Sequence, residues 1–316
     1  MNYNNIFTKA IERQCILAKK AIFSLNSKIL NLNLPIDLQI DLYSKLVIPI
    51  LTYGCEVWGF ENTNAIELLH RSFIKNILRV NKYVSNSIIY GETGTTKIEV
   101  EIYTRMIGYW HRLRSGPNTK ISKILFTFIK KLSDNNIYRG RWVSKVRDIL
   151  DKTGSSYLWN FERISSGKLK SNIKQKLYDA FLQNWQSDIN TNILCSNYRI
   201  MKVNFGQEFY LKEMPKDLRI ILTKFRTGNH NLPISDQRYN QIDERNTCPL
   251  CYTDVGDEYH YVMNCPAFDH IRAKYISSTF ITPANTLTFH KLFSTKSIPN
   301  LTKLCKFLKI IMHVFK

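Results

Sequence analysis

The stretch Cys248-Pro249-Leu250-Cys251 is followed by His260 and Cys265, and together these residues have the spacing C-x2-C-x8-H-x4-C. Two cysteines separated by two residues can bind one metal ion from a tight turn, and a histidine and a cysteine separated by four residues can complete a tetrahedron. No other part of the sequence places chemically reactive residues so close together. The spacing predicts one structural zinc ion, because four protein ligands leave no open position for a catalytic water.

Two other interpretations of this stretch stay open. A redox-active thiol pair would look the same over Cys248 and Cys251, and the spacing could arise by chance. Against the redox interpretation, the pair does not lie between a strand and a helix, and further ligand types follow at metal-site spacing. The other cysteines lie alone in apolar or mixed segments, as buried thiols do, at Cys15, Cys55, Cys195 and Cys305.

The composition indicates a folded, intracellular chain. Of the 316 residues, 44% are hydrophobic and 12% are aromatic, which excludes a disordered protein. An odd number of cysteines without a pairing pattern favours a reducing compartment, the cytoplasm or the nucleus. The polar start of the chain does not resemble a secretory signal. The most apolar run, residues 46–60, is interrupted by Pro49, Gly54 and Glu56 and is too short to span a bilayer. We therefore expect a soluble protein that is not secreted and has no membrane partner.

The charge is strongly basic and unevenly distributed. Forty-five Lys and Arg residues against 25 Asp and Glu residues give a net charge of +20. Residues 105–152 contain 12 basic residues and only three acidic ones. Such an excess predicts a polyanionic partner, RNA or DNA, although a solvated basic face without a partner stays an alternative. The candidate nucleic-acid contacts are Arg105, Arg112, Arg114, Lys130, Lys131, Arg139, Arg141 and Arg226.

Hydrophobic periodicity predicts a mainly α protein. Apolar residues recur at helical spacing over most of the chain, and residues 197–211 alternate in a way that predicts one or two short strands. A turn is expected around Gly91 and Gly94, and the helix that follows Pro35 is expected to bend or break at Pro49. The predicted helices are 3–27, 36–59, 64–80, 97–114, 120–133, 142–152, 168–189, 218–225, 266–280 and 300–315.

Breaks in the pattern predict three consecutive domains. The Gly116-Pro117 break and the stretch 190–206 divide the chain into a helical body (1–115), a basic helical connection (118–195) and a zinc-binding C-terminal module with flanking helices (197–316). The expected fold is thus a bundle-like helical body with a small zinc-binding module near the C-terminus.

The residues needed for common enzymatic reactions are missing from the sequence. A polymerase needs paired carboxylates that hold two divalent metal ions, and no two aspartates are adjacent anywhere in the chain. Glycine patterns of nucleotide-binding loops and the Gly-x-Ser-x-Gly pattern of hydrolases are also missing. We therefore expect that this chain alone is not an enzyme.

Two motifs resemble one protein family. The run from Leu46 to Gly59, Leu-Val-Ile-Pro-Ile-Leu-Thr-Tyr-Gly-Cys-Glu-Val-Trp-Gly, resembles the segment just after the catalytic palm of non-LTR (LINE-type) retrotransposon reverse transcriptases. The stretch from Phe225 to His230, followed by the C-x2-C-x8-H-x4-C pattern and Pro266, resembles the zinc-binding tail of the same polyproteins. The matches, in this order, cover roughly residues 35–270.

The resemblance implies the C-terminal third of a reverse transcriptase: the end of the polymerase region, a helical thumb or connection, and the zinc segment. In that family this portion helps to hold template RNA and target DNA during target-primed reverse transcription. The family's catalytic aspartates and endonuclease would then lie before Met1, and the upstream polymerase region is an expected partner. Zinc ligation carries over to Cys248, Cys251, His260 and Cys265.

Other functions stay open at this stage. The chain could be part of an active RNA-directed DNA polymerase that a missing N-terminal region completes. It could also be a protein-interaction scaffold that uses the basic amphipathic segment 300–315, or a degenerate transposon remnant.

Overall fold

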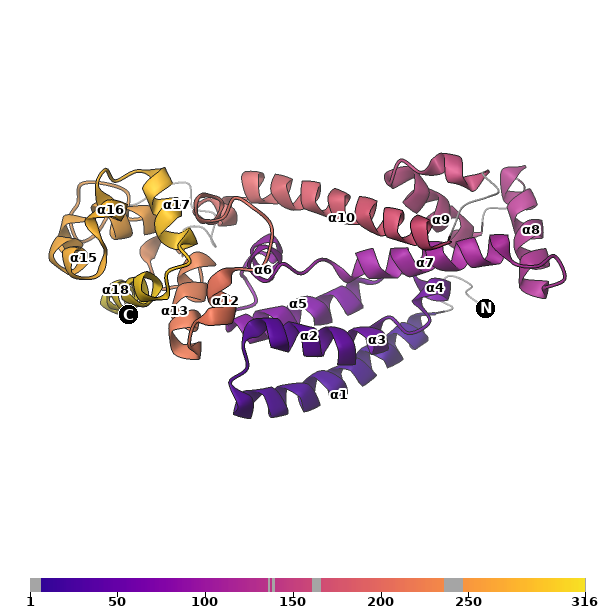
Figure 1. Ribbon diagram of the computed structural model, residues 1–316, viewed down its shortest axis with the longest axis horizontal. Coiled ribbons are helices and arrows are strands. Elements are labelled where there is room, and N and C mark those ends of the chain that lie inside the picture. The colour runs from indigo at the N-terminus through magenta and orange to yellow at the C-terminus, as the bar shows by residue number, and fades with distance from the viewer. Residues whose placement is uncertain (1–6, 136, 138–139, 161–165, 236–246, 316) are drawn as a thin grey trace. The chain divides into compact units, whose positions relative to one another are not determined.

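The computed structural model describes residues 7–135, 137, 140–160, 166–235 and 247–315, and it is mainly helical (Figure 1). The α-helices are α1 (Thr8–Leu32), α2 (Ile36–Leu46), α3 (Ile48–Leu51), α4 (Cys55–Trp58), α5 (Asn64–Leu78), α6 (Asn86–Thr93), α7 (Ile98–Ser115), α8 (Ile121–Asp134), α9 (Arg141–Lys152), α10 (Ser166–Thr191), α11 (Tyr198–Met201), α12 (Phe209–Glu213), α13 (Lys216–Arg226), α15 (Asp269–Tyr275), α16 (Ser278–Ile281), α17 (Thr286–Ser294) and α18 (Ile298–Val314). Short 3-10 helices lie at Ser156–Trp159, Ile193–Cys195 and Pro266–Phe268, and a π-helical turn lies at His260–Asn264.

The chain forms two compact units. Unit 1 contains Met1–Ser27, Leu42–His70 and Thr96–Gln183, and unit 2 contains Lys28–Asp41, Arg71–Thr95 and Asn184–Lys316. This division differs from the three consecutive domains that the sequence predicts. The two divisions differ because segments distant in sequence pack together within each unit. The composition of linkers does not reveal such packing.

The core of unit 1 is built around α7. Ile102, Met106 and Trp110 form a fully buried stripe at spacings of four residues, and α4 and α9 pack against this helix. Trp110 stacks on Trp159 with ring centroids 5.9 Å apart. Trp142 of α9 donates its indole N–H to the carbonyl oxygen of Glu56 in α4, at 2.8 Å. Helices α4 and α9 are thereby joined to each other as well as to α7.

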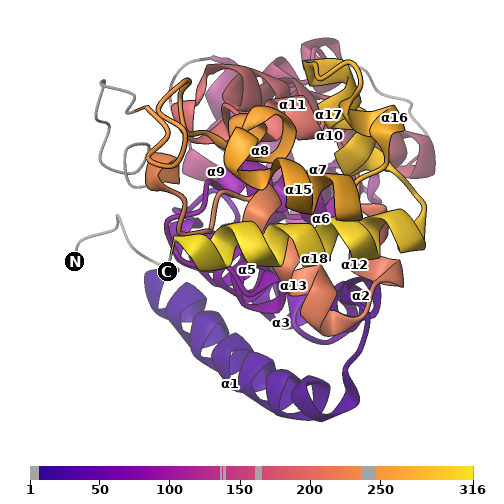
Figure 2. The same ribbon diagram turned by 90° about the vertical axis from the view of Figure 1, so that its left-hand side faces the viewer.

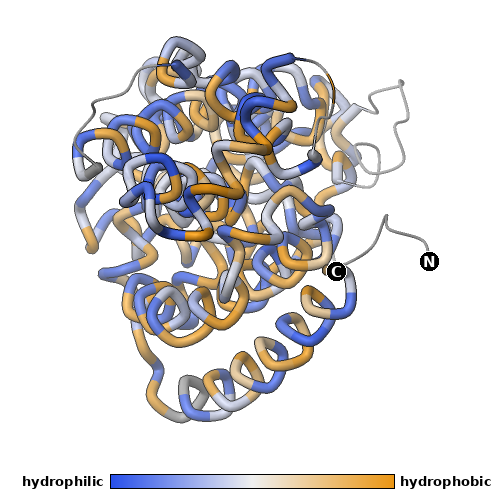
Figure 3. Tube along the Cα trace, turned by 90° about the vertical axis from the view of Figure 1, so that its right-hand side faces the viewer, coloured by the Kyte–Doolittle hydropathy of each residue, from blue (hydrophilic) through white to orange (hydrophobic). Residues whose placement is uncertain are grey.

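Helix α1 is amphipathic, and Figure 3 shows hydrophobic and hydrophilic residues alternating along its turns. Its buried positions Ile11, Cys15, Ala18 and Leu25 recur every three to seven residues and therefore lie on one face. Burial of this face, rather than helix propensity alone, stabilises a helix of this kind.

A buried ion pair joins α6 and α13 in unit 2. The side chains of Glu92 and Arg226 are both fully buried, and the guanidinium group donates to both carboxylate oxygens at 2.8–3.3 Å. A third guanidinium nitrogen donates to the carbonyl oxygen of Phe293 in α17, at 3.1 Å. Burial acts to raise the pKa of the Glu92 carboxyl, but the charge of Arg226 holds it below its usual value. One arginine thus connects three helices.

Helix α18 is part of the core of unit 2. It packs against α13 and α15, as Figure 2 shows, and its apolar side chains at Leu304, Phe307, Leu308 and Ile311 are fully buried. The helix predicted at 300–315 is confirmed. Its apolar face is covered by the chain itself, so a partner of this helix would have only its polar face to bind.

Several predicted helices are confirmed within a few residues, namely those realised as α1, α5, α7, α8, α9, α10, α13 and α18. The helix predicted over 36–59 is divided into α2, α3 and α4, with one interruption before Pro49 and another at Gly54, whose φ is +69°. The helix predicted over 266–280 is likewise divided, into a 3-10 turn, α15 and α16.

The strands predicted over 197–211 are wrong. Helices α11 and α12 occupy this segment, and its only ladder-like pairing is an isolated bridge between Thr93 and Gln207. The described ranges contain no strand at all. Lys202, which is buried, and Glu208, which is half-buried, form an ion pair instead.

The turn predicted around Gly91 is also wrong, because α6 forms there and ends only at Gly94. All its residues from Ser87 to Thr93 are buried, so the helix lacks the amphipathic period that reveals a surface helix. Gly91 permits close packing inside it: a Cβ there would lie 2.6 Å from the Tyr198 hydroxyl and 3.0 Å from the Trp185 ring.

No helix among the described residues combines the length and apolar character that crossing a membrane requires.

Loss of Arg226 should destabilise unit 2 strongly. We expect Arg226→Met to lower the free energy of unfolding by about 3–5 kcal/mol, because it leaves the Glu92 carboxylate buried without its cation. The matched control is Arg105→Met, whose ion pair with Glu101 in α7 is about one-third exposed and should cost about 0.3–0.5 kcal/mol. Urea unfolding followed by circular dichroism measures both.

The double variant Glu92→Gln/Arg226→Met should recover part of the loss, because it removes the uncompensated charge. Equal destabilisation by Arg226→Met and Arg105→Met would contradict this role of the buried pair.

Candidate metal centre and basic surface

Four side chains of unit 2 gather into one cluster. The ligand atoms of Cys248, Cys251, His260 and Cys265 all lie within 4.8 Å of one another. Three of these residues are buried and Cys251 is half-buried, at the edge of the group. The cluster could hold one metal ion.

The spacing of the ligand atoms matches a tetrahedral site. Metal–sulfur bonds of about 2.3 Å and metal–nitrogen bonds of about 2.0 Å place two sulfurs about 3.8 Å apart and a sulfur and a nitrogen about 3.5 Å apart. Cys248 Sγ lies 3.9 Å from Cys265 Sγ, and Cys251 Sγ lies 3.3 Å from His260 Nε2. The donor atoms therefore need little movement to coordinate a common ion.

Two local backbone features bring the ligands together. The first cysteine pair lies on a turn in which Tyr252 N donates to Cys248 O at 2.9 Å and Cys248 N donates to Asp254 O at 2.7 Å. Gly256 allows the returning chain to pass close to this turn, since a Cβ there would lie 3.2 Å from Cys248 Cα. Residues 248–256 therefore form a compact turn, and the chain continues from it to His260.

The second feature is the π-helical turn at His260–Asn264. Its hydrogen bond from Cys265 N to His260 O, at 2.8 Å, spans five residues and brings these two ligands to the same side of the chain. Such turns are rare and occur frequently at functional sites. The buried Arg272 supports it by donating to the carbonyl oxygens of Val262 and Cys265, at 2.8 Å each. Carbonyl groups that a regular helix would satisfy are satisfied here by one side chain.

The histidine is oriented for coordination through Nε2. His260 Nε2 faces the sulfur of Cys251, whereas Nδ1 is buried without a hydrogen-bond partner and lies 3.7 Å from Asp254 Oδ2. Metal-bound histidines usually direct their second ring nitrogen to a carboxylate or carbonyl group. Asp254 is in the position to take this role after a small movement.

The thiols of Cys251 and Cys265 differ in pKa. A hydrogen bond with the Thr253 hydroxyl, whose oxygen lies 3.1 Å from the sulfur, lowers the pKa of Cys251 to about 6. Burial raises the pKa of Cys265 to about 12. Because thiolates are the metal ligands, Cys251 is largely ready to coordinate at neutral pH, whereas Cys265 has to release a proton.

A chain of buried hydrogen bonds connects the metal segment to the turn after α13. Glu258, two residues before a ligand, accepts from Asn197 and lies 3.0 Å from His230 Nε2. His230 Nδ1 in turn lies 2.8 Å from Ser235 Oγ. In the sequence His230 stands only at the end of the stretch that resembles a zinc-binding tail, and no spacing rule pairs it with Glu258. All four side chains are buried in unit 2, so these bonds form a structural link.

The predicted nucleic-acid contacts have different environments in the structure. Arg112 of α7 and Lys131 of α8 are exposed. Arg112 lies over the ring of Tyr109, with 5.7 Å from the guanidinium carbon to the ring centroid. These two side chains have the exposure that a phosphate contact requires.

Four further candidates are bound to other groups of unit 1. Arg105 pairs with Glu101 at 2.7 Å, and Arg141 donates to both carboxylate oxygens of Glu61. Arg114 donates to a backbone carbonyl group and lies over Trp110, and Lys130 pairs with Asp134. Contacts of this kind fix the direction of a charged group and partly neutralise it.

Two candidates need separate treatment. Arg226 is fully buried in its ion pair with Glu92, so the prediction that it contacts nucleic acid is wrong and its role is to hold the core of unit 2 together. Its buried partner lies 134 residues away in the sequence, so the local charge pattern does not reveal the pairing. Arg139 lies outside the described residues.

Sequence reasoning did not identify Lys170 as a site residue. It lies near the start of α10 and faces the same space as Arg105 and Arg112. Proximity of residues so distant in sequence could not be read from charge patterning.

Comparisons of the chain with protein-family models, curated proteins and solved structures find no match.

We expect the purified chain to contain one bound metal ion, measurable by atomic emission spectrometry. Cys248→Ser/Cys251→Ser should remove it, because two ligands cannot hold the ion tightly, and a chelator should lower the melting temperature of the wild-type chain and of the control but not of the double variant. Cys305→Ser is the matched control, since this buried thiol of α18 belongs to unit 2 but lies outside the cluster. Metal retained by the double variant would contradict the assignment.

Metal binding should weaken as the pH falls. Above about pH 6, Cys251 is already a thiolate, so binding need not displace its proton, whereas Cys265 has to lose its own at any pH below about 12. The number of protons released per bound metal ion should therefore be larger at about pH 5 than at about pH 7.5. Calorimetric titration in buffers of different ionisation enthalpy measures this number; equal proton release at both pH values would be inconsistent with the low pKa of Cys251.

Proposed function

We propose that this chain is a zinc-stabilised, non-catalytic part of a non-LTR retrotransposon reverse transcriptase that holds template RNA or target DNA. The family attribution rests on two sequence motifs, at residues 46–59 and 225–266. In this proposal the metal centre stabilises the C-terminal module, and basic helices of unit 1 bind the phosphate backbone.

Zinc is the metal that the donor set favours. Three sulfurs and one imidazole nitrogen in a tetrahedral arrangement suit zinc, which has no preference for other geometries. When bound, the ion would supply folding energy rather than catalysis, since four protein ligands complete its coordination. Cys248 and Cys251 would hold it from the turn, and His260 and Cys265 from the π-helical turn.

The observation that carries the nucleic-acid part of the proposal is the excess of positive charge, +20 for the chain, concentrated in residues 105–152. Helices α7 and α8 carry its exposed members Arg112 and Lys131. Cations that neutralise phosphates release condensed counterions, which makes binding strong at low salt and insensitive to sequence. A protein that holds RNA or DNA of any sequence needs such phosphate contacts.

A second candidate function is protein binding through α8, and a specific observation favours it. The apolar side chains Ile121, Ile124, Leu125 and Phe128 recur at helical spacing and are 54–75% exposed. Apolar stripes of this kind mark interaction surfaces more often than solvated ones. The upstream polymerase region that the family resemblance implies is the partner we propose for it.

Salt should weaken nucleic-acid binding steeply. We expect the logarithm of the affinity for a labelled single-stranded oligonucleotide to fall linearly with the logarithm of salt concentration, with a slope of about −0.7 for each phosphate neutralised. Arg112→Gln/Lys131→Gln should weaken binding and make the slope shallower by about 0.7 for each phosphate that is no longer neutralised. Fluorescence anisotropy at several salt concentrations measures both quantities.

Two controls separate this function from general charge and from protein binding. Lys303→Gln/Lys306→Gln removes the same charge from exposed positions of α18 and should leave the slope unchanged. Ile124→Ser/Phe128→Ser removes the apolar stripe without changing the charge and should leave the affinity unchanged. Affinity that stays constant between low and moderate salt would refute the phosphate contacts.

A further inference from the structure

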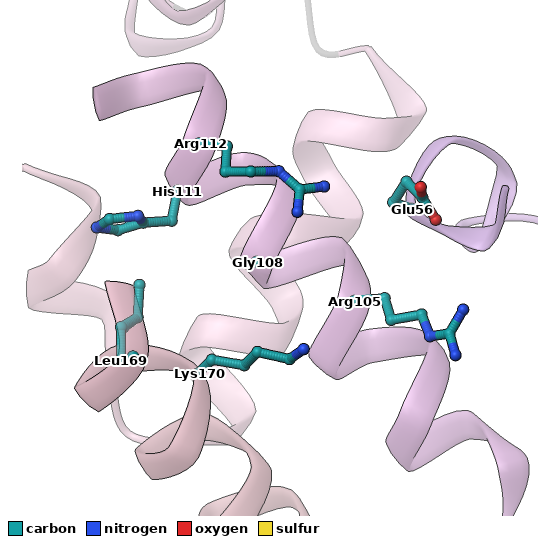
Figure 4. Close-up of a pocket in the computed structure, with 8 residues that line it drawn as sticks. Glu56, Arg105, Gly108, His111, Arg112, Leu169 and Lys170 are labelled. Atoms are coloured by element: carbon teal, nitrogen blue, oxygen red, sulfur yellow. The ribbon is translucent and has the colours of Figure 1, made fainter. Parts of the chain in front are cut away.

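Unit 1 contains a pocket of about 380 Å³ between α7, α4 and the start of α10 (Figure 4). Volumes of this size are typical of small-molecule sites. The residues that line it are Glu56, Arg105, Gly108, His111, Arg112, Gly167, Leu169 and Lys170.

The charges of the pocket are predominantly positive. Arg105, Arg112 and Lys170 contribute three basic side chains, and Glu56 of α4 contributes the one carboxylate of the lining. Figure 4 shows Lys170 reaching from α10 towards α7 and Arg112 extending towards Glu56, whereas the guanidinium group of Arg105 is directed away from Lys170. Arg112 and Lys170 therefore approach the pocket from two helices, and an anion there would be attracted by both.

Arg112 is held in position by a neighbouring side chain, because its guanidinium group lies over the Tyr109 ring. Arg105 is instead bound through Nε to Glu101, at 2.7 Å, which keeps it away from Arg112. A guanidinium group has five N–H donors, so one such contact orients the fork and leaves further donors for a ligand. Positioning before binding reduces the entropy that binding would otherwise lose.

Gly108 keeps the floor of the pocket open. It lies on the same face of α7 as Arg105 and Arg112, three and four residues away, and a Cβ built on it would meet nothing within 4 Å. Packing therefore does not require glycine here, although glycine is among the least favourable residues for a helix interior. Its effect is to leave room beside the cations for a ligand to approach the helix.

We propose that this pocket binds a phosphate group, with Arg112 and Lys170 contacting its oxygen atoms. A guanidinium fork and an ammonium group together match several oxygens on one centre better than the two oxygens of a carboxylate. The volume exceeds that of a phosphate group alone, so the phosphate carries an organic group. Its source is either the backbone of a polynucleotide, which rests on the proposed function, or a free nucleotide, which does not.

The test uses two pocket variants of the whole chain. Gly108→Leu fills the pocket without changing the charge and favours the helix, and Arg112→Gln/Lys170→Gln removes two cations without filling it. Their matched controls are Ser24→Leu and Lys19→Gln/Lys20→Gln, at exposed positions of α1 in the same unit. Thermal melting of each variant checks that it is folded.

The probes are adenosine monophosphate, titrated by calorimetry, and a labelled single-stranded oligonucleotide, followed by fluorescence anisotropy. We expect both pocket variants to weaken binding of adenosine monophosphate by at least about tenfold and the controls to change it by less than about twofold. If the oligonucleotide also binds more weakly to the pocket variants and adenosine monophosphate competes with it, the phosphate source is the polynucleotide backbone. If only adenosine monophosphate is affected, the source is a free nucleotide.

Failure of this inference is distinguishable from failure of the proposed function. Pocket variants that bind both probes as the controls do would overturn the inference, even when the oligonucleotide binds the wild-type chain tightly. A wild-type chain that binds adenosine monophosphate in the pocket but no oligonucleotide would support the inference and refute the proposed function. A wild-type chain that binds neither probe would refute both.

Discussion

The ligand atoms of Cys248, Cys251, His260 and Cys265 lie within 4.8 Å of one another, and the turn and π-helical turn that carry them keep them there. Thiolates this close repel each other unless a cation neutralises them, so the arrangement suits a bound metal ion. The centre is also continuous with the core of unit 2. Tyr261, next to a ligand, packs on Phe268, which packs on Phe307 of α18. We therefore expect the folding of the metal-binding segment and the packing of helix α18 to depend on each other.

Basic side chains occupy two kinds of environment in the described part of the chain, and sequence patterns do not separate them. Arg226 and Arg272 are buried, and their guanidinium groups satisfy a carboxylate and several carbonyl oxygens that would otherwise be unpaired. Arg112 and Lys131 are exposed, where phosphate contacts are possible. Burial depends on which segments meet in space, so a count of basic residues overstates the surface available to a polyanion.

The sequence predicted the parts of the fold that depend on local pattern. Long amphipathic helices such as α7 and α10 were found because one face is apolar at helical spacing. Helix α6 shows no helical period in the sequence because it is buried all round. The segments of α11 and α12 show none because four or five residues are too few, so their sequence alternates like a strand. The cluster of Cys248, Cys251, His260 and Cys265, which could hold one metal ion, follows from a spacing that is itself local, whereas Glu258 pairing with His230 and Lys170 approaching α7 depend on tertiary contacts.

X-ray absorption at the zinc edge of the purified chain tests the metal centre most directly, because it reports the atoms bound to the ion rather than its presence. A first shell of three sulfurs at about 2.3 Å and one nitrogen at about 2.0 Å is expected. A shell made only of oxygen and nitrogen atoms, or a chain that holds no zinc when purified in its presence, would contradict the assignment of Cys248, Cys251, His260 and Cys265 as ligands.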